Sequence, residues 1–180
     1  MNTAAAFATP SKTVLDMVTI GEYTTSTNVV PQAGFIIYQT EPTVPWMQDL
    51  TDIQSQVNTG KAAINFFSDE LQADAAKLLP ENTDLQKLQM NEFIPISALN
   101  YEEAYGDITA GFVFPTFYPA GQPLVALAAV YTLVNAVTNE WSAEWIACPA
   151  KANMGKVYVT FPADYVEKLE GGWGSLVILN

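Results

Sequence analysis

From residue 88 onward the sequence is a succession of short apolar segments separated by turn residues, and this pattern leaves few folds open. Several of these segments alternate apolar and polar residues, which favours strands over helices. The stretch 122–134 is apolar almost throughout, as in a strand covered on both faces. The regular spacing predicts an antiparallel β-sandwich. The segments are 88–99, 107–114, 122–134, 139–148, 156–161 and 173–180.

Before residue 88 the periodicity is that of helices. Apolar residues recur every three or four positions from Trp46 to Val57, which predicts a helix that Asn58 and Gly60 end. A second amphipathic helix is expected over 61–79, stopped by Pro80. Its polar face carries acids and one lysine and is interpreted as a solvated surface. These residues are Asp69, Glu70, Asp74 and Lys77.

Two shorter elements complete the prediction. FIIYQT at 35–40 has the composition of a strand, and 162–172 is expected to form a short helical turn between the last two strands. The predicted fold class is α+β, with two parts. Residues 1–87 form an N-terminal extension with one short strand and a helical hairpin, and residues 88–180 form the sandwich.

Charge argues against several functional classes. Acidic residues number 19 and basic residues 7, all of them lysines, so the formal net charge is −12. Nucleic-acid binding depends on neutralising phosphates, for which arginine is best suited, and we expect no nucleic-acid partner. The chain also contains no histidine. Serine and cysteine triads and histidine metal sites are therefore excluded, and we predict that the protein is not an enzyme.

The apolar segments are too short for a membrane span, and those at the N-terminus are too short for the centre of a signal peptide. The longest one, 123–137, is short of the roughly 20 residues that span a bilayer, so we expect no membrane insertion. Residues 1–13 lack the charged start and apolar centre of a signal peptide. Cys148, the single cysteine, is expected to be a buried small apolar residue.

The segment NYEEAYGD at 100–107 is the candidate cation site. Calcium is bound by six to eight oxygens, and Asn100, Glu102 and Asp107 offer oxygen ligands. The neighbouring Glu102 and Glu103 point apart, however, and the alternating spacing of calcium loops is missing. The spacing favours a polar loop turned by Gly106, with Ca²⁺ as the alternative and no other cofactor expected.

Aromatic residues suggest two further sites. Trp141 and Trp145 lie four positions apart on one strand, hence on one face, where they either build the core or stack on a carbohydrate. Five other rings lie in or beside turns, a position typical of a contact surface for a protein partner. These are Tyr101, Tyr105, Phe117, Tyr118 and Trp173.

Three segments between Asp107 and Asn180 also carry a resemblance. They are FPTFYPAGQPLVALAAVY, EWSAEWIACPA and GKVYVTFPADYVEKLEGGWGSLVILN. With their Pro-Gly turn, tryptophan-bearing strand and T-F-P turn into a short helix, they resemble prokaryotic immunoglobulin-like accessory modules of bacterial surface and secreted proteins. The resemblance implies an Ig-like antiparallel β-sandwich over 88–180. Such modules bind, space or assemble, and they share no functional residues to transfer.

These observations favour a non-catalytic structural or interaction protein. We expect a bacterial surface module or a self-assembling subunit whose partner is another protein or a second copy. A structural protein of a phage virion and a carbohydrate-binding module are the alternatives. The cell surface, secretion or a virion is the expected location.

Overall fold

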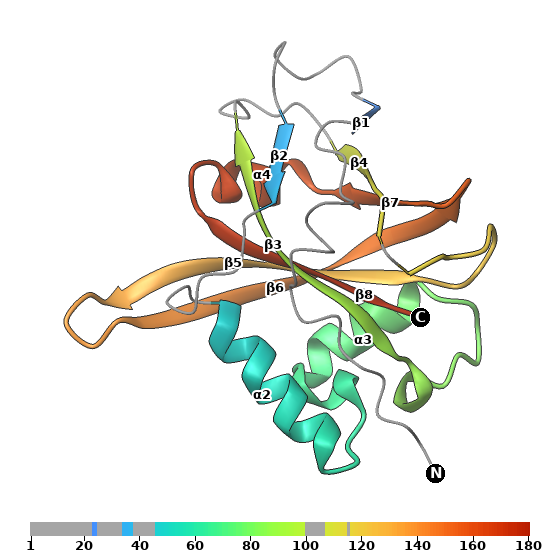
Figure 1. Ribbon diagram of the computed structural model, residues 1–180, viewed down its shortest axis with the longest axis horizontal. Helices are drawn as coiled ribbons and strands as arrows, with labels where there is room; N and C mark the ends of the chain where they lie inside the picture. The colour runs from blue at the N-terminus through green and yellow to red at the C-terminus, as the bar shows by residue number, and fades with distance from the viewer. Residues whose placement is uncertain (1–22, 25–33, 38–45, 100–106, 115) are drawn as a thin grey trace.

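A computed structural model describes residues 23–24, 34–37, 46–99, 107–114 and 116–180, and Figure 1 shows a curled β-sheet with helices on both sides. The strands are β1 (Tyr23–Thr24), β2 (Gly34–Ile37), β3 (Met90–Leu99), β4 (Ile108–Phe112), β5 (Val125–Asn135), β6 (Glu140–Asn153), β7 (Lys156–Phe161) and β8 (Trp173–Leu179). The α-helices are α2 (Trp46–Asn58), α3 (Asp69–Lys77) and α4 (Ala163–Leu169), and the 3₁₀ turns are η1 (Ala63–Phe66) and η2 (Leu85–Lys87).

The eight strands form one sheet in the order β1-β4-β7-β6-β5-β8-β3-β2, and every pairing between neighbours is antiparallel. Long-range pairing is extensive, because the C-terminal strand β8 lies between β3 and β5. The α+β class predicted from the sequence is confirmed.

Strand β6 curls the sheet because it serves two neighbours in succession. Its residues 140–149 pair with β5, whereas only Ala150 to Asn153 pair with β7. Pro149, which has no N–H to donate, stands at the change of partner. The result is a half-barrel made from one continuous sheet, where the sequence had predicted a sandwich of two sheets. The difference arises because β6 runs on for 14 residues instead of ending near residue 148.

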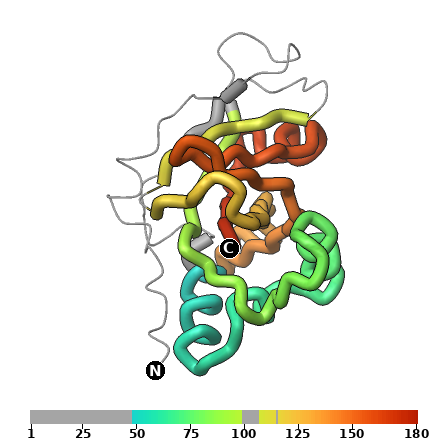
Figure 2. Tube along the Cα trace, turned by 90° about the vertical axis from the view of Figure 1, so that its right-hand side faces the viewer, coloured from blue at the N-terminus to red at the C-terminus, as the bar shows by residue number. Residues whose placement is uncertain are grey.

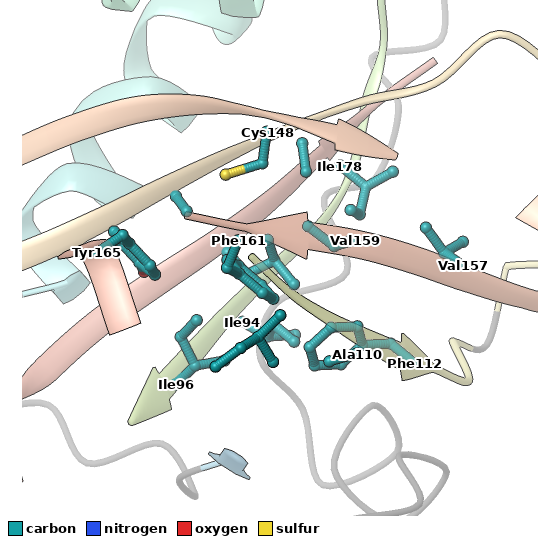
Figure 3. Packing of buried hydrophobic residues seen from close by; sticks show 14 of the residues in the cluster. Ile94, Ile96, Ala110, Phe112, Cys148, Val157, Val159, Phe161, Tyr165 and Ile178 are labelled. Carbon is teal, nitrogen blue, oxygen red and sulfur yellow. The ribbon is translucent and has the colours of Figure 1, made fainter. Parts of the chain in front are cut away.

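The first cluster of buried side chains fills the inside of the curl. It joins the inward faces of β3, β4, β5, β7 and β8 to helix α4. Figure 3 shows part of this inner cluster, including Phe161 stacked on Tyr165 at a ring distance of 5.5 Å. Cys148 lies here, fully buried, as the sequence predicted.

A second cluster of buried side chains lies on the other face of the sheet, beneath α2, η1 and α3. Figure 2 shows the helical region on this face. Strand β5 contributes to both clusters, with Ala126 and Ala128 facing inward and Val125 and Leu127 facing the helices. This two-sided burial explains its nearly continuous apolar sequence. Helix α2 is fixed to the sheet by Tyr131, whose hydroxyl donates to Asp49 Oδ2 at 2.8 Å.

The helix expected over 61–79 is divided in two. Phe67 and Ser68 have extended backbone angles between η1 and α3. The hydroxyl of Ser68 accepts a hydrogen bond from the Leu71 amide at 3.3 Å and so caps α3. The apolar spacing continues across the break, so periodicity alone predicts one helix, and only the capping serine marks the interruption. Within the part of the chain that the structure describes, no helix combines the length and apolar character needed to cross a bilayer.

Candidate interaction site at the open edge of β6

The outer edge of β6 is not paired by any described strand over most of its length. Residues 140–149 pair with β5 on one side, and on the other side the described residues supply no strand until β7 begins to pair at Ala150. In Figure 1 the β5–β6 hairpin extends beyond the rest of the sheet. An unpaired strand edge presents backbone N–H and C=O groups that another extended chain can bind. We define the open edge as residues 140–149.

A groove of about 500 Å³ lies between the open edge and helix α3. Trp145, Leu71 and Leu78 give it an apolar floor, and Glu70 and Asp74 provide acidic groups. Helix α3 reaches this position because Ser68 caps it and because Leu71 and Ala75 are buried on the sheet.

A smaller pocket of about 100 Å³ lies on the opposite face of the sheet, between the open edge and helix α4. Val130 and Tyr165 contribute its apolar wall, and Glu144 and Asp164 its acidic groups. Helix α4 approaches the sheet closely because Gly174 has no side chain. A Cβ atom there would lie 2.5 Å from Leu169 Cδ1 of the helix.

The two hollows meet at the strand edge itself. Ile146 and Ala147 line both of them, so one hollow opens on each face of the same short length of strand. Successive side chains of an extended chain point to opposite faces. A strand added along β6 would therefore place alternate side chains into the α3 groove and the α4 pocket.

The electrostatics of the hollows are acidic. Together they contain four carboxylates, two in each hollow, and one lysine in each. Lys77 lies 2.7 Å from Asp74, and Lys168 lies 2.7 Å from Glu144. Glu70 and Asp164 make no ion pair with the described residues. Each lysine is therefore already matched by a carboxylate, and the site has acidic groups in excess.

The tip of the β5–β6 hairpin is apolar and exposed. Leu133 and Val134 are 42% and 61% exposed, and Val137 is 96% exposed. Asn135 Oδ1 accepts a hydrogen bond from the Val137 amide at 2.9 Å, which fixes the turn. Exposed aliphatic side chains continuous with an open strand edge are typical of contact surfaces.

The two tryptophans predicted as core or carbohydrate platform are both half-buried against the outer cluster. Trp145 packs edge-on against Phe67 and Phe93, with ring centroids 5.0 and 6.4 Å away. Trp141 donates its indole N–H to Asn139 Oδ1 at 3.1 Å. The rings are therefore part of the packing between β6 and the helices, and Trp145 also forms the floor of the α3 groove.

The rings predicted as a contact surface are separated by the fold. Phe117 is 73% exposed, whereas Tyr118 is 1% exposed and packs against Phe114 in the inner cluster. The expectation that Tyr118 forms a surface was wrong, because its ring completes the core at the end of the curl. Trp173 is half-buried against the outer cluster. Tyr101 and Tyr105 lie outside the described residues.

Of the acidic segment 100–107, only Asp107 lies among the described residues. Asn100, Glu102 and Glu103 lie outside the described residues, and Asp107 is exposed just before β4. Among the residues that the structure describes, no three acidic or cysteine side chains gather closely enough to hold a metal ion. The calcium interpretation therefore stays a prediction.

Titratable groups in the inner cluster are held in their neutral forms. Burial raises the pKa of the Cys148 thiol to about 12, with a smaller contribution from Asp107. Burial also raises the pKa of Tyr165 well above its usual value, and its hydroxyl donates to the Ala129 carbonyl at 3.0 Å. A neutral thiol and a neutral phenol buried in this way contribute to packing of the inner cluster.

Sequence reasoning did not find the open edge. Helical periodicity places Glu70 and Asp74 on a solvated helix surface, and no sequence motif includes Ile146 or Ala147. The available signal was Pro149, since a proline inside a strand indicates an edge or a change of partner.

Comparisons of the chain with protein-family models, with curated proteins and with solved structures find no match.

Proposed function

We propose that this is a non-catalytic interaction protein that binds an extended segment of another protein by adding it as a strand along the open edge of β6. The observation that carries the proposal is the stretch 140–149, whose outer side no described strand pairs, with a hollow on each face at Ile146 and Ala147. In strand addition the backbone hydrogen bonds supply affinity, and pockets for alternate side chains supply specificity. Both parts are present here.

Two further features support the same role. The open edge continues into the apolar hairpin tip at Leu133, Val134 and Val137, which extends the available contact surface. The strand-and-turn pattern of the C-terminal half resembles Ig-like accessory modules, which bind, space or assemble. A module of a bacterial surface protein and a component of a virion are both settings for such a function.

A panel of three peptides tests the proposal. Each has about ten residues, the length of the open edge, with valine at every second position between threonine ends. The other positions carry lysine in the first peptide, glutamine in the second and glutamate in the third. Each peptide is titrated into the isotope-labelled full chain while backbone amide signals and hydrogen exchange are followed.

At least one peptide should slow amide exchange and shift signals specifically over residues 140–149. Strand addition uses alternate backbone amides of the added strand. Proline placed at every second peptide position should therefore abolish binding in one register and preserve it in the other. If no peptide affects the open edge at millimolar concentration, or if prolines in both registers are tolerated, the proposal is wrong.

A further inference from the structure

The acidic lining of both hollows indicates which partner the open edge selects, an inference that rests on the proposed function. We infer that the partner segment is basic, with lysine or arginine side chains directed into the α3 groove and small apolar side chains directed into the α4 pocket. The partner belongs to another protein and not to a second copy of this chain.

The α3 groove fits a long basic side chain. Its floor, formed by Trp145, Leu71 and Leu78, can cover the apolar stem of a lysine or arginine, while Glu70 and Asp74 lie where the charged end would arrive. A cation over the tryptophan ring gains further stabilisation. The volume of about 500 Å³ suits one or two such side chains.

The α4 pocket fits a different side chain. At about 100 Å³ it has room for a small apolar group against Val130, Ile146 and Tyr165. Its charged groups, Asp164 and the Glu144–Lys168 ion pair, stand at its rim. The two hollows therefore specify an alternation of basic and small apolar residues, which is the side-chain pattern of one extended strand.

The sequence argues against a second copy as the partner. All seven basic residues are lysines, and the closest two, Lys151 and Lys156, stand five positions apart, so no segment of this chain has basic residues at alternate positions. Two copies would also each carry a net charge of −12. Antiparallel pairing of two β6 edges centred on Ser142 would place Glu140 of each copy opposite Glu144 of the other, which like charges disfavour.

The peptide panel described above separates this inference from the proposed function. The lysine peptide should bind more tightly than the glutamine peptide, and the glutamate peptide should bind least. The preference for lysine should decrease as salt is added, because salt screens the exposed carboxylates. Equal affinities of the lysine and glutamine peptides at the open edge would overturn the inference and leave strand addition intact. Failure of all three would remove both.

Substitutions in the hollows locate the preference. Glu70→Gln should weaken binding of the lysine peptide about two- to fivefold, as expected for a single exposed charge pair, whereas Asp164→Asn, beside the pocket that takes the valine side chains, should weaken it less. Both side chains are exposed, so the fold should be unaffected. Glu81→Gln, an exposed change in the turn after α3, is the matched control and should leave binding unchanged.

Charge reversal gives the sharpest result. Glu70→Lys should weaken binding of the lysine peptide further and improve binding of the glutamate peptide, while the valine positions still contact the α4 pocket. If Glu70→Lys leaves the order of the three peptide affinities unchanged, the carboxylates of the α3 groove do not select the peptide and the inference is wrong.

Discussion

Glu92 in β3 is a carboxyl group enclosed by the protein, with no exposed surface. Neither of its oxygens makes a hydrogen bond of good geometry with the described residues, although Thr116 lies close enough to offset part of the cost. Burial therefore raises the pKa of Glu92 above its usual value. Tyr118 is buried beside it, and the proximity of Glu92 contributes to the raised pKa of its hydroxyl after burial itself.

Replacing Glu92 by glutamine should stabilise the protein at neutral pH. A carboxyl whose pKa is raised on folding stabilises the native state below its unfolded pKa, and this contribution is lost as the pH rises through the folded pKa. Glu92→Gln should match the natural chain near pH 3 and unfold at a higher temperature at pH 7. Thermal unfolding of both proteins between pH 3 and pH 7 measures this difference in melting temperature. Glu81→Gln, exposed in a turn, should show no such divergence, and a lower melting temperature for Glu92→Gln at pH 7 would contradict the prediction.

At the scale of elements, the position of α4 on the sheet decides the geometry of the inner cluster. The helix buries Tyr165, Val166 and Leu169, and it approaches β5 and β8 where β8 has a glycine. A Cβ atom at Gly174 would lie 2.5 Å from Leu169 Cδ1 and 2.6 Å from the Ala129 carbonyl oxygen. The second contact is with backbone, which cannot yield without moving a central strand.

Gly174→Ala should destabilise the protein by about 1–3 kcal/mol, the usual cost of overpacking a core. The matched control is Gly172→Ala, since a Cβ at Gly172 would meet its nearest atom at an ordinary 3.5 Å. Chemical denaturation of both variants measures the difference in the free energy of unfolding. Equal stabilities would show that α4 is not held in close contact with the sheet. Because α4 also forms the wall of the small pocket, Gly174→Ala should in addition weaken binding of the lysine peptide.

At the scale of the whole molecule, the helices and the sheet share one interior. The outer cluster takes Leu50, Ile53, Ile64 and Leu71 from the helical region, and the sheet residues they contact come from β3, β5 and β8. Figure 2 shows these helices packed on the face of the sheet opposite α4. The sheet is therefore covered on both sides, and neither half of the chain buries its apolar surface alone.

A fragment consisting of residues 88–180 should not form a stable monomer. Removing the helices would expose Val125, Leu127, Val177 and Leu179, all fully buried in the complete chain. Burial of such side chains contributes roughly 1.5–3 kcal/mol each, comparable in sum to the stability of a whole domain. The fragment should give a poorly dispersed amide spectrum or aggregate, while the full chain gives a dispersed one. A cooperatively folded, monomeric fragment would show that the strands are an independent domain.

The sequence by itself determined most of the elements and their order. The helix at 46–58, the strand at 156–161 and the short helix before β8 follow from local signals: apolar periodicity, β-branched composition, and proline or glycine at the ends. The burial of Cys148 also follows from the sequence, because a single cysteine in an apolar strand packs as a small apolar residue. These properties depend on residues within a few positions of each other.

Only the tertiary structure decided how the strands are paired and what they leave open. Whether β6 has one neighbour or two depends on where β7 and β5 lie, and these contacts join residues that no local pattern connects. Long-range contacts also decide the position of Tyr118, which lies in a turn-rich segment but packs in the inner cluster. They likewise place Glu70 and Asp74 beside a strand edge as well as in solvent. A half-barrel with an open edge and a sandwich bury the same alternating strands. The alternation determines which side chains turn inward, and the long-range pairing of backbones determines which strand edge the described residues leave unpaired.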